Sequence, residues 1–183
     1  DLSGIGQDLV GMCVNDLICT GGDPYIFLDY YAVGRFEKKI AQDFLKGVRL
    51  ACEMSNCDLV GGETAEMPGV YQQKHFDCAG FAVGLVDEDK RWGKHLVQEG
   101  DILIGLASSG FHSNGYSLLR KTFEGEWTKY KNWLLEPTRL YVKPIQDAKL
   151  NFTIHGAAHI TGGGLDNIPR ILNSDLCAKI KNV

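Results

Sequence analysis

Two adjacent polar residues, Asn15 and Asp16, give the first indication of chemistry because they interrupt an otherwise apolar stretch. On a helical wheel Asp16 falls between Leu9 and Met12, inside the apolar stripe of a predicted helix, so the sequence predicts that it is buried. A buried carboxylate is costly unless it has a metal ion, a cation or hydrogen-bond donors. We interpret Asp16 as a site residue; the alternative is a structural acid that caps a neighbouring element or pairs with a lysine.

Asp29 poses the same question inside the run Ile26-Phe27-Leu28-Asp29-Tyr30-Tyr31. The run is rich in aromatic and β-branched residues and is typical of a strand. Because side chains alternate between the two faces of a strand, Asp29 either faces the core or points to solvent. The sequence leaves both alternatives open.

A glycine pair follows a predicted strand in the segment Gly61-Gly62-Glu63-Thr64-Ala65-Glu66-Met67-Pro68. Glycines at the end of a strand let the backbone approach a phosphate closely. Glu63 and Thr64 offer oxygen atoms of the kind that Mg²⁺ prefers. The segment lacks the G-x-x-x-x-G-K-[ST] pattern, which excludes an ordinary P-loop. The alternative is a simple turn.

Two further loops have compositions suited to anion binding. The segment Ser108-Ser109-Gly110-Phe111-His112-Ser113-Asn114-Gly115 joins a predicted strand to a predicted helix and offers N–H groups, hydroxyls and an imidazole. His112 can donate to a phosphate or to a carbonyl that gains charge, or it merely caps the helix. The segment Thr161-Gly162-Gly163-Gly164 precedes a helical segment and is a second candidate phosphate cradle. His155 and His159 lie on a predicted strand and are interpreted as structural.

The composition is that of a globular protein: of 183 residues, 44% are hydrophobic and 23% are charged. No uninterrupted apolar run of about 18 residues occurs, so we expect no membrane span. The net charge of −4 and the scattered lysines argue against a nucleic-acid surface. The six cysteines form no C-x-x-C pair, and the chain does not open with a signal-peptide pattern, so we expect a cytoplasmic protein.

Helices and strands alternate in the predicted order, which places the chain in the α/β or α+β class. Helical periodicity predicts helices over residues 8–19 and 36–55, with others that begin near Tyr116, at Pro137 and at Leu165. Runs of aromatic and β-branched residues predict strands over residues 25–33, 57–60, 77–86, 101–107 and 152–160. The polar stretch 87–100 has no periodicity and is the predicted domain boundary.

Taken together, these segments resemble the phosphoribosylformylglycinamidine cyclo-ligase family, also called AIR synthetase, nearly from end to end. The residues that carry the resemblance are 4–10, 13–16, 27–31, 61–68, 108–117, 137–141 and 159–169. The most specific part is Gly-Gly-Glu-Thr-Ala-Glu-Met-Pro at residues 61–68. Sister families such as selenophosphate synthetase and thiamine-phosphate kinase keep the glycine pair and continue it differently.

The resemblance implies an α/β fold of two domains, at residues 1–90 and 98–183. The first would be a half-barrel that a second subunit completes in a homodimer. The implied reaction uses ATP to phosphorylate the formyl oxygen of formylglycinamidine ribonucleotide, after which an amidine nitrogen attacks the activated carbon and phosphate leaves. Mg²⁺ would bridge the triphosphate.

The resemblance also implies roles for single residues. Asp16 and His112 would be catalytic, and Asp16 and Glu63 would bind the metal. The expected ATP and phosphate contacts are Asn15, Gly61, Gly62, Glu63, Thr64, Gly162, Gly163 and Gly164. The expected substrate contacts are Ser109, Ser113, Asn114 and Gly115.

One departure concerns the start of the chain. Family members carry a glycine-rich Asp-Gly-Val-Gly-Thr-Lys segment upstream of the position that is Asp1 here, and its aspartate and lysine are expected at the ATP site. The last part of the second domain is also missing, so we expect a fragment of a longer protein, with Asp16 as half of an acidic pair. The alternatives are a shortened, inactive binding domain and a sister ATP-dependent enzyme.

Overall fold

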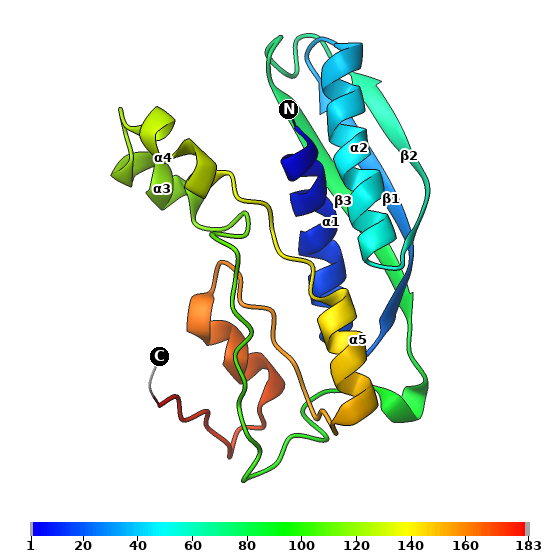
Figure 1. Cartoon of the computed structure of the whole chain (residues 1–183), viewed down its shortest axis with the longest axis vertical. Helices are drawn as coiled ribbons and strands as arrows, with labels where there is room; N and C mark the ends of the chain where they lie inside the picture. The colour runs from blue at the N-terminus through cyan, green and yellow to red at the C-terminus, as the bar shows by residue number, and fades with distance from the viewer. Residues whose placement is uncertain (1, 182–183) are drawn as a thin grey trace.

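The first half of the chain folds into a small sheet that is covered on one face by two helices. The computed structural model describes residues 2–181 (Figure 1). The elements of this half are α1 (Ser3–Ile18), β1 (Asp23–Val33), α2 (Lys38–Met54), β2 (Asp58–Glu66) and β3 (Phe76–Leu85). The strand order is β2-β1-β3, with β2 parallel and β3 antiparallel to β1. Helix α2 is therefore the crossover between two parallel strands.

The core of this half lies between the sheet and the two helices. Alternate residues of β1, Phe27 and Tyr31, face the helices and are buried. Helix α2 presents Phe44 and Val48, four residues apart, to the same core. The Tyr31 and Phe44 rings stack with their centroids 5.0 Å apart. The predicted strand at 25–33 and the predicted helix at 36–55 are thus confirmed.

Helices α1 and α2 cross at very short range because glycine stands at the contact. A β-carbon on Gly6 would lie 2.6 Å from the Val48 backbone nitrogen, and one on Gly47 would collide with the Ser3 backbone. No side chain larger than hydrogen fits between the two backbones at this crossing. The crossing fixes α1 against the layer that carries the core.

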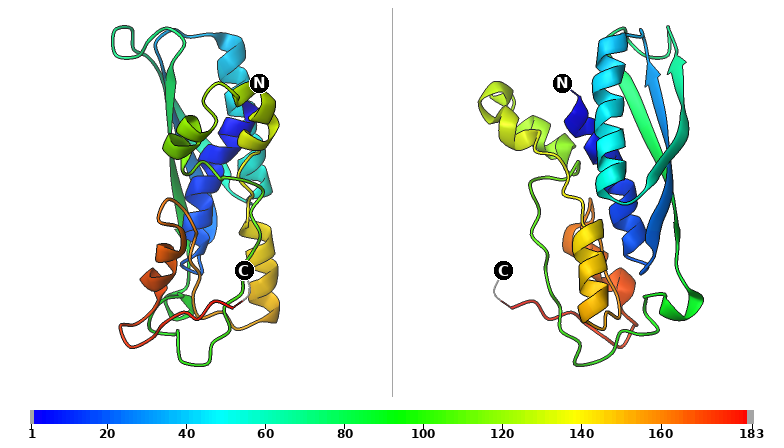
Figure 2. Two further views of the ribbon diagram at one scale, coloured as in Figure 1. Left: turned by 90° about the vertical axis from the view of Figure 1, so that its left-hand side faces the viewer. Right: turned by 45° about the vertical axis from the view of Figure 1, so that its right-hand side comes forward.

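The second half of the chain lies on the side of α1 that faces away from the sheet (Figure 2). Its elements are two short 3₁₀ segments (Glu88–Lys90 and Gly164–Ile171) and the helices α3 (Tyr116–Thr122), α4 (Trp127–Leu134) and α5 (Val142–Asn151). Nothing in the sequence analysis predicted α4. Among residues 2–181, no helix is long and apolar enough to cross a membrane.

Four predicted elements differ from the structure. Segments 101–107 and 152–160 are not strands, because in residues 2–181 neither pairs with another strand in a sheet. The helix expected at Pro137 begins only at Val142, because α1 holds residues 138–141 in place through hydrogen bonds. Residues 61–66 belong to β2 and form no loop after it.

The crossing of α1 and α2 leads to a first prediction. Replacing Gly6 by Ala should lower the free energy of unfolding by about 1–3 kcal/mol, because the new methyl group has no room. Gly105→Ala is the matched control, since no atom lies within 4 Å of its β-carbon position. Urea denaturation of both variants measures the effect, and equal midpoints would contradict the close crossing.

Candidate functional site

One side of α1 holds the backbone of the segment that leads into α5. The Gln7 side chain donates to the Thr138 carbonyl at 2.8 Å. Asp8 Oδ1 accepts hydrogen bonds from the Thr138 N–H at 2.8 Å and from its hydroxyl at 2.6 Å. A β-carbon on Gly11 would come within 2.9 Å of the Thr138 methyl carbon. These contacts place the second half of the chain against α1.

Asn15 completes this set of contacts from deep inside the interface. Its side chain is 2% exposed, donates to the Arg139 carbonyl at 2.9 Å and accepts from the Tyr141 N–H at 3.0 Å. Both ends of the carboxamide are therefore satisfied by backbone. Within the described chain Asn15 fastens residues 139–141 to α1, which gives a structural reason for its burial. Its expected contact with ATP stays a prediction.

Asp16 does not lie in the core, so the predicted burial of this residue was wrong. Its side chain is 69% exposed, and Met12, one turn earlier on the same face, is 45% exposed. The helical wheel misled because the apolar residues of α1 serve two packing surfaces and leave a solvent-facing strip between them. Asp16 Oδ1 lies 2.7 Å from Nδ1 of His159, which reaches it from the second half of the chain.

Among residues 2–181 the buried acid is Asp29, on the helix-covered face of β1. Its neighbours in the sheet are Gly62 on β2 and Gly80 on β3. A β-carbon on Gly62 would lie 2.9 Å from the Asp29 carboxyl carbon. Burial raises the pKa of Asp29, because the charged form loses solvation. Gly62 thus has a packing reason to be glycine that involves no phosphate.

Glu63 and Thr64 lie in adjacent positions of β2 and so point to opposite faces of the sheet. Thr64 pairs with Tyr31, whose side chain is in the core, and Glu63 pairs with Tyr30 on the outer face. The prediction that Glu63 and Thr64 lie together in a loop after the strand was therefore wrong. Gly61 differs from Gly62, since nothing lies within 4 Å of its β-carbon position. The packing of the described chain gives no reason for glycine at position 61.

His112 fastens its loop to residues 137–139 and caps no helix. Its Nε2 accepts hydrogen bonds from the Ser109 N–H at 2.9 Å and from the Arg139 backbone N–H at 3.3 Å. The Ser109 hydroxyl donates to the Pro137 carbonyl at 2.7 Å. Burial, and then the charge of nearby His159, lower the pKa of His112, which favours the neutral ring that accepts here. The N-cap of α3 is Gly115, so the capping alternative was wrong.

The loops at 109–115 and 161–164 come together, as sites built from two glycine-rich loops require. Asn114 donates to the His112 carbonyl at 2.7 Å, and its Oδ1 lies 3.6 Å from the β-carbon position of Gly162. Gly163 lies against Asn167, whose Oδ1 accepts the Thr161 N–H at 2.8 Å. These loops and the second half of α1 form one cluster. Ser113 and Gly115 belong to it through the same loop, and both are exposed.

The expected metal site is not formed by this chain alone. Among residues 2–181, no group of three or more His, Cys, Asp and Glu side chains is arranged to hold a metal ion. Asp16 projects from α1 into solvent and Glu63 from the outer face of β2, and one oxygen of Asp16 already contacts His159. The described residues therefore do not fit a complete Mg²⁺ site, and we derive no chemical step through the metal.

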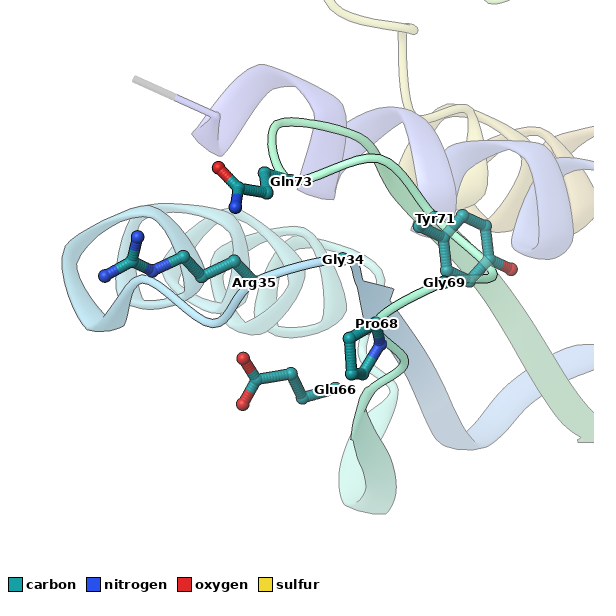
Figure 3. Close-up of a pocket in the computed structure, with 7 residues that line it drawn as sticks. All are labelled: Gly34, Arg35, Glu66, Pro68, Gly69, Tyr71 and Gln73. Carbon is teal, nitrogen blue, oxygen red and sulfur yellow. The ribbon is translucent and has the colours of Figure 1, made fainter.

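Two pockets lie beside the predicted motifs. The first, of about 410 Å³, lies where β1 and β2 end, with Arg35 and Glu66 extending from neighbouring strand ends (Figure 3). Pro68, at the end of the 61–68 motif, also lines it. The second, of about 370 Å³, contains Ser109 and Arg139 and adjoins the anchored loop of His112. Sequence reasoning assigned no role to Arg35 or Arg139, although Arg35 follows the predicted strand 25–33 and Arg139 lies within the recognised segment 137–141.

The buried acid leads to a second prediction. A raised pKa in the folded state means that the contribution of Asp29 to stability is complete at low pH and is lost as the pH rises through the folded-state pKa. Asp29→Asn should therefore raise the melting temperature at pH 7, with a gain that shrinks toward pH 4. Thermal unfolding across this range measures it, with Asp58→Asn, an exposed residue, as the control. A constant gain at all pH values would contradict the assignment.

Two family models match the chain. The model of AIR synthase related protein, N-terminal domain, matches residues 1–86, and that of the C-terminal domain matches residues 98–181. A phosphoribosylformylglycinamidine cyclo-ligase from Clostridium acetobutylicum is 50% identical over 182 residues, covering 96% of this chain and 55% of that protein. The chain therefore spans about half the length of the curated relatives it matches.

Solved structures share the fold at low identity. Thiamine-monophosphate kinase from Stenotrophomonas maltophilia K279a superposes with a TM-score of 0.62 at 18% identity, covering 86% of this chain and 49% of that chain. AaThiL complexed with AMPPCP and TMP superposes with a TM-score of 0.50 at 22% identity, covering 80% of this chain and 46% of that chain. The predicted α/β class is thereby confirmed.

Proposed function

Because the chain belongs to the AIR synthase related family and has its fold, we propose that its protein is a phosphoribosylformylglycinamidine cyclo-ligase. The identity of 50% with such an enzyme across 96% of this chain is the observation that carries the proposal. The reaction would close the imidazole ring of formylglycinamidine ribonucleotide at the expense of ATP, giving 5-aminoimidazole ribonucleotide, ADP and phosphate. It is a step of purine biosynthesis.

The chemistry explains why ATP is needed. An amide oxygen is a very poor leaving group, so transfer of the terminal phosphoryl group to the formyl oxygen turns it into a good one. The ribose-bearing nitrogen of the amidine then attacks the activated carbon, and phosphate departs with its oxygen. Positioning of two substrates supplies most of what the protein must do in such a reaction.

We propose that formylglycinamidine ribonucleotide binds at the loop 109–115 and in the pocket beside it. Ser109, Ser113, Asn114 and Gly115 lie on that loop, and Arg139 lines the pocket. An arginine that lines a pocket is suited to a phosphate group such as that of the ribonucleotide. His112 would act by holding the loop against residues 137–139, because its Nε2 is engaged there.

We propose that ATP binds at the glycines 61–62 and 162–164. Glu63 and Thr64, which follow the first glycines in sequence, and Asn15, which precedes Asp16, are the other proposed contacts. The open space at Gly61 supports close approach of a ligand or a partner chain. AaThiL, which has a similar fold, was solved with AMPPCP bound. For Mg²⁺ we propose Asp16 and Glu63 as carboxylate ligands in the assembled protein, since the described chain alone does not bring them together.

We also propose a cytoplasmic location. All six cysteines are free thiols, as is usual for proteins of a reducing compartment.

Turnover by the full-length protein tests the proposed function. With ATP, Mg²⁺ and formylglycinamidine ribonucleotide, we expect an aminoimidazole product and one ADP per turnover. Asp16→Asn should lower kcat by about 100-fold if its charge contacts the reacting groups. Asp147→Asn, on the exposed side of α5, is the control. Folded protein that gives no aminoimidazole, or that phosphorylates thiamine monophosphate instead, would exclude the cyclo-ligase.

We propose that the protein forms a homodimer and that the uncovered face of the sheet is the interface. Helices cover only one face (Figure 2), and the other exposes neighbouring apolar side chains on β1 and β3, namely Leu28, Phe81 and Leu85. Gly61 pairs with Leu28 on this face and leaves room beside it. Exposed apolar patches of this kind are typical of interfaces.

Sedimentation of the full-length protein tests the dimer. Phe81→Glu should convert a dimer to a monomer, because it places a charge in the middle of the apolar face. Val70→Glu, in the loop between β2 and β3, is the control, since Val70 is equally exposed but lies outside the sheet. A wild-type monomer, or a Phe81→Glu variant that stays dimeric, would contradict the proposal.

A further inference from the structure

His159 links α1 to the glycine-rich loops through only one of its two ring nitrogens. Its side chain is 10% exposed, and its Nδ1 lies 2.7 Å from Asp16 Oδ1. An ionised carboxylate only accepts hydrogen bonds, so Nδ1 carries the proton and donates it. In the neutral ring Nε2 is then an acceptor with a free lone pair. This Nε2 is buried and has no hydrogen-bond partner in the described chain.

A second unmet polar atom lies on the other side of the same loop. Asn167 is 1% exposed, and its Oδ1 accepts the Thr161 N–H, while its Nδ2 has no partner among the described residues. Residues 2–181 contain three such buried side-chain atoms, and the third is Ser55 Oγ at the end of α2. An unmet acceptor at His159 and an unmet donor at Asn167 therefore flank residues 161–164.

Buried polar groups in native proteins are almost always paired, so an unmet pair beside one loop points to a missing ligand. His159 also lies near the His112 ring of the neighbouring loop. In this neutral tautomer Nε2 accepts, so the ligand that satisfies it is a hydrogen-bond donor. Formylglycinamidine ribonucleotide carries amidine N–H groups, and the adenine amino group of ATP is the other donor of this class.

We propose that His159 contacts the substrate, with Nε2 accepting a hydrogen bond from an amidine N–H of formylglycinamidine ribonucleotide. Asp16 orients the ring through Nδ1 and so positions the acceptor. The inference rests on the proposed function and deepens it by naming the group that recognises the amidine. The substrate is the expected donor because His159 lies near His112 of the loop 109–115 that we assign to the substrate. The glycines at 162–164 are proposed to hold the phosphates of ATP, and the adenine amino group lies at the opposite end of that molecule.

An asparagine variant separates the contact from the structural role. In His159→Asn the side-chain nitrogen takes the place of Nδ1 and still donates to Asp16, but no atom reaches the position of Nε2. In His159→Gln the carboxamide reaches the Nε2 position with an oxygen that accepts. His155→Asn is the matched control, because His155 pairs with Asp101 through Nδ1 at 2.8 Å on the same segment.

Calorimetric titration of the full-length protein gives the Kd of each variant for the ribonucleotide and for ATP. We expect His159→Asn to weaken ribonucleotide binding about tenfold or more, the effect of one lost hydrogen bond, and to leave ATP binding within about twofold of wild type. His159→Gln should recover part of the affinity. His155→Asn should bind both ligands as the wild type does.

Three results would overturn the assignment. They are wild-type ribonucleotide affinity in His159→Asn, loss of ATP affinity in its place, and an equal loss in His155→Asn. Thermal unfolding monitors folding, and if His159→Asn is unfolded, stronger ribonucleotide binding by His159→Gln than by His159→Ala supports the contact. Equal binding by those two variants overturns it. Failure of the proposed function is distinguishable, because the wild-type protein would then form no aminoimidazole.

Discussion

The structure depends on helix α1 being packed on two sides. Toward the sheet, glycine lets it touch the backbone of α2 at Gly6 and Gly47. Toward the second half of the chain, Asp8 and Asn15 take up the backbone polar groups of residues 138–141. Both surfaces are specific. The surface toward α2 has no room for a β-carbon, and on the other surface the side chains of Asp8 and Asn15 form hydrogen bonds with the backbone of residues 138–141. Every loop of the candidate site is therefore positioned by the same helix.

The two-sided packing of α1 explains which parts of the site the sequence could predict. An amphipathic stripe with one face, as in α2, is readable from spacing alone, and its predicted position was confirmed. In α1 nearly every position looks apolar, so spacing could not show that the strip through Met12 and Asp16 faces solvent. Asp29 shows the opposite case, because strand alternation left its direction open and only the covering helices decide it.

Neighbouring glycines that looked alike in sequence differ in how tightly the structure packs around them. Gly62 is required because Asp29 occupies the space of its side chain, whereas no atom lies within 4 Å of the β-carbon position of Gly61. The segments 101–107 and 152–160 failed as strands for a related reason, since a strand exists only with a partner. Their exposed apolar residues, such as Ile102 and Phe152, follow the strand pattern without its pairing. The local pattern of apolar residues indicates only a propensity for strand. Whether the segment pairs with another strand depends on the whole fold.

The contact between Asp16 and His159 joins residues 143 positions apart, so no local pattern could reveal it. Once formed, it changes the meaning of both side chains. Asp16 needs no burial to be held in one orientation, and His159 presents a fixed acceptor that the chain leaves unmet. An unmet buried acceptor costs about 1–3 kcal/mol, a large part of the stability of a small domain. A ligand that satisfies it therefore stabilises the fold at the point where α1 meets the glycine-rich loops.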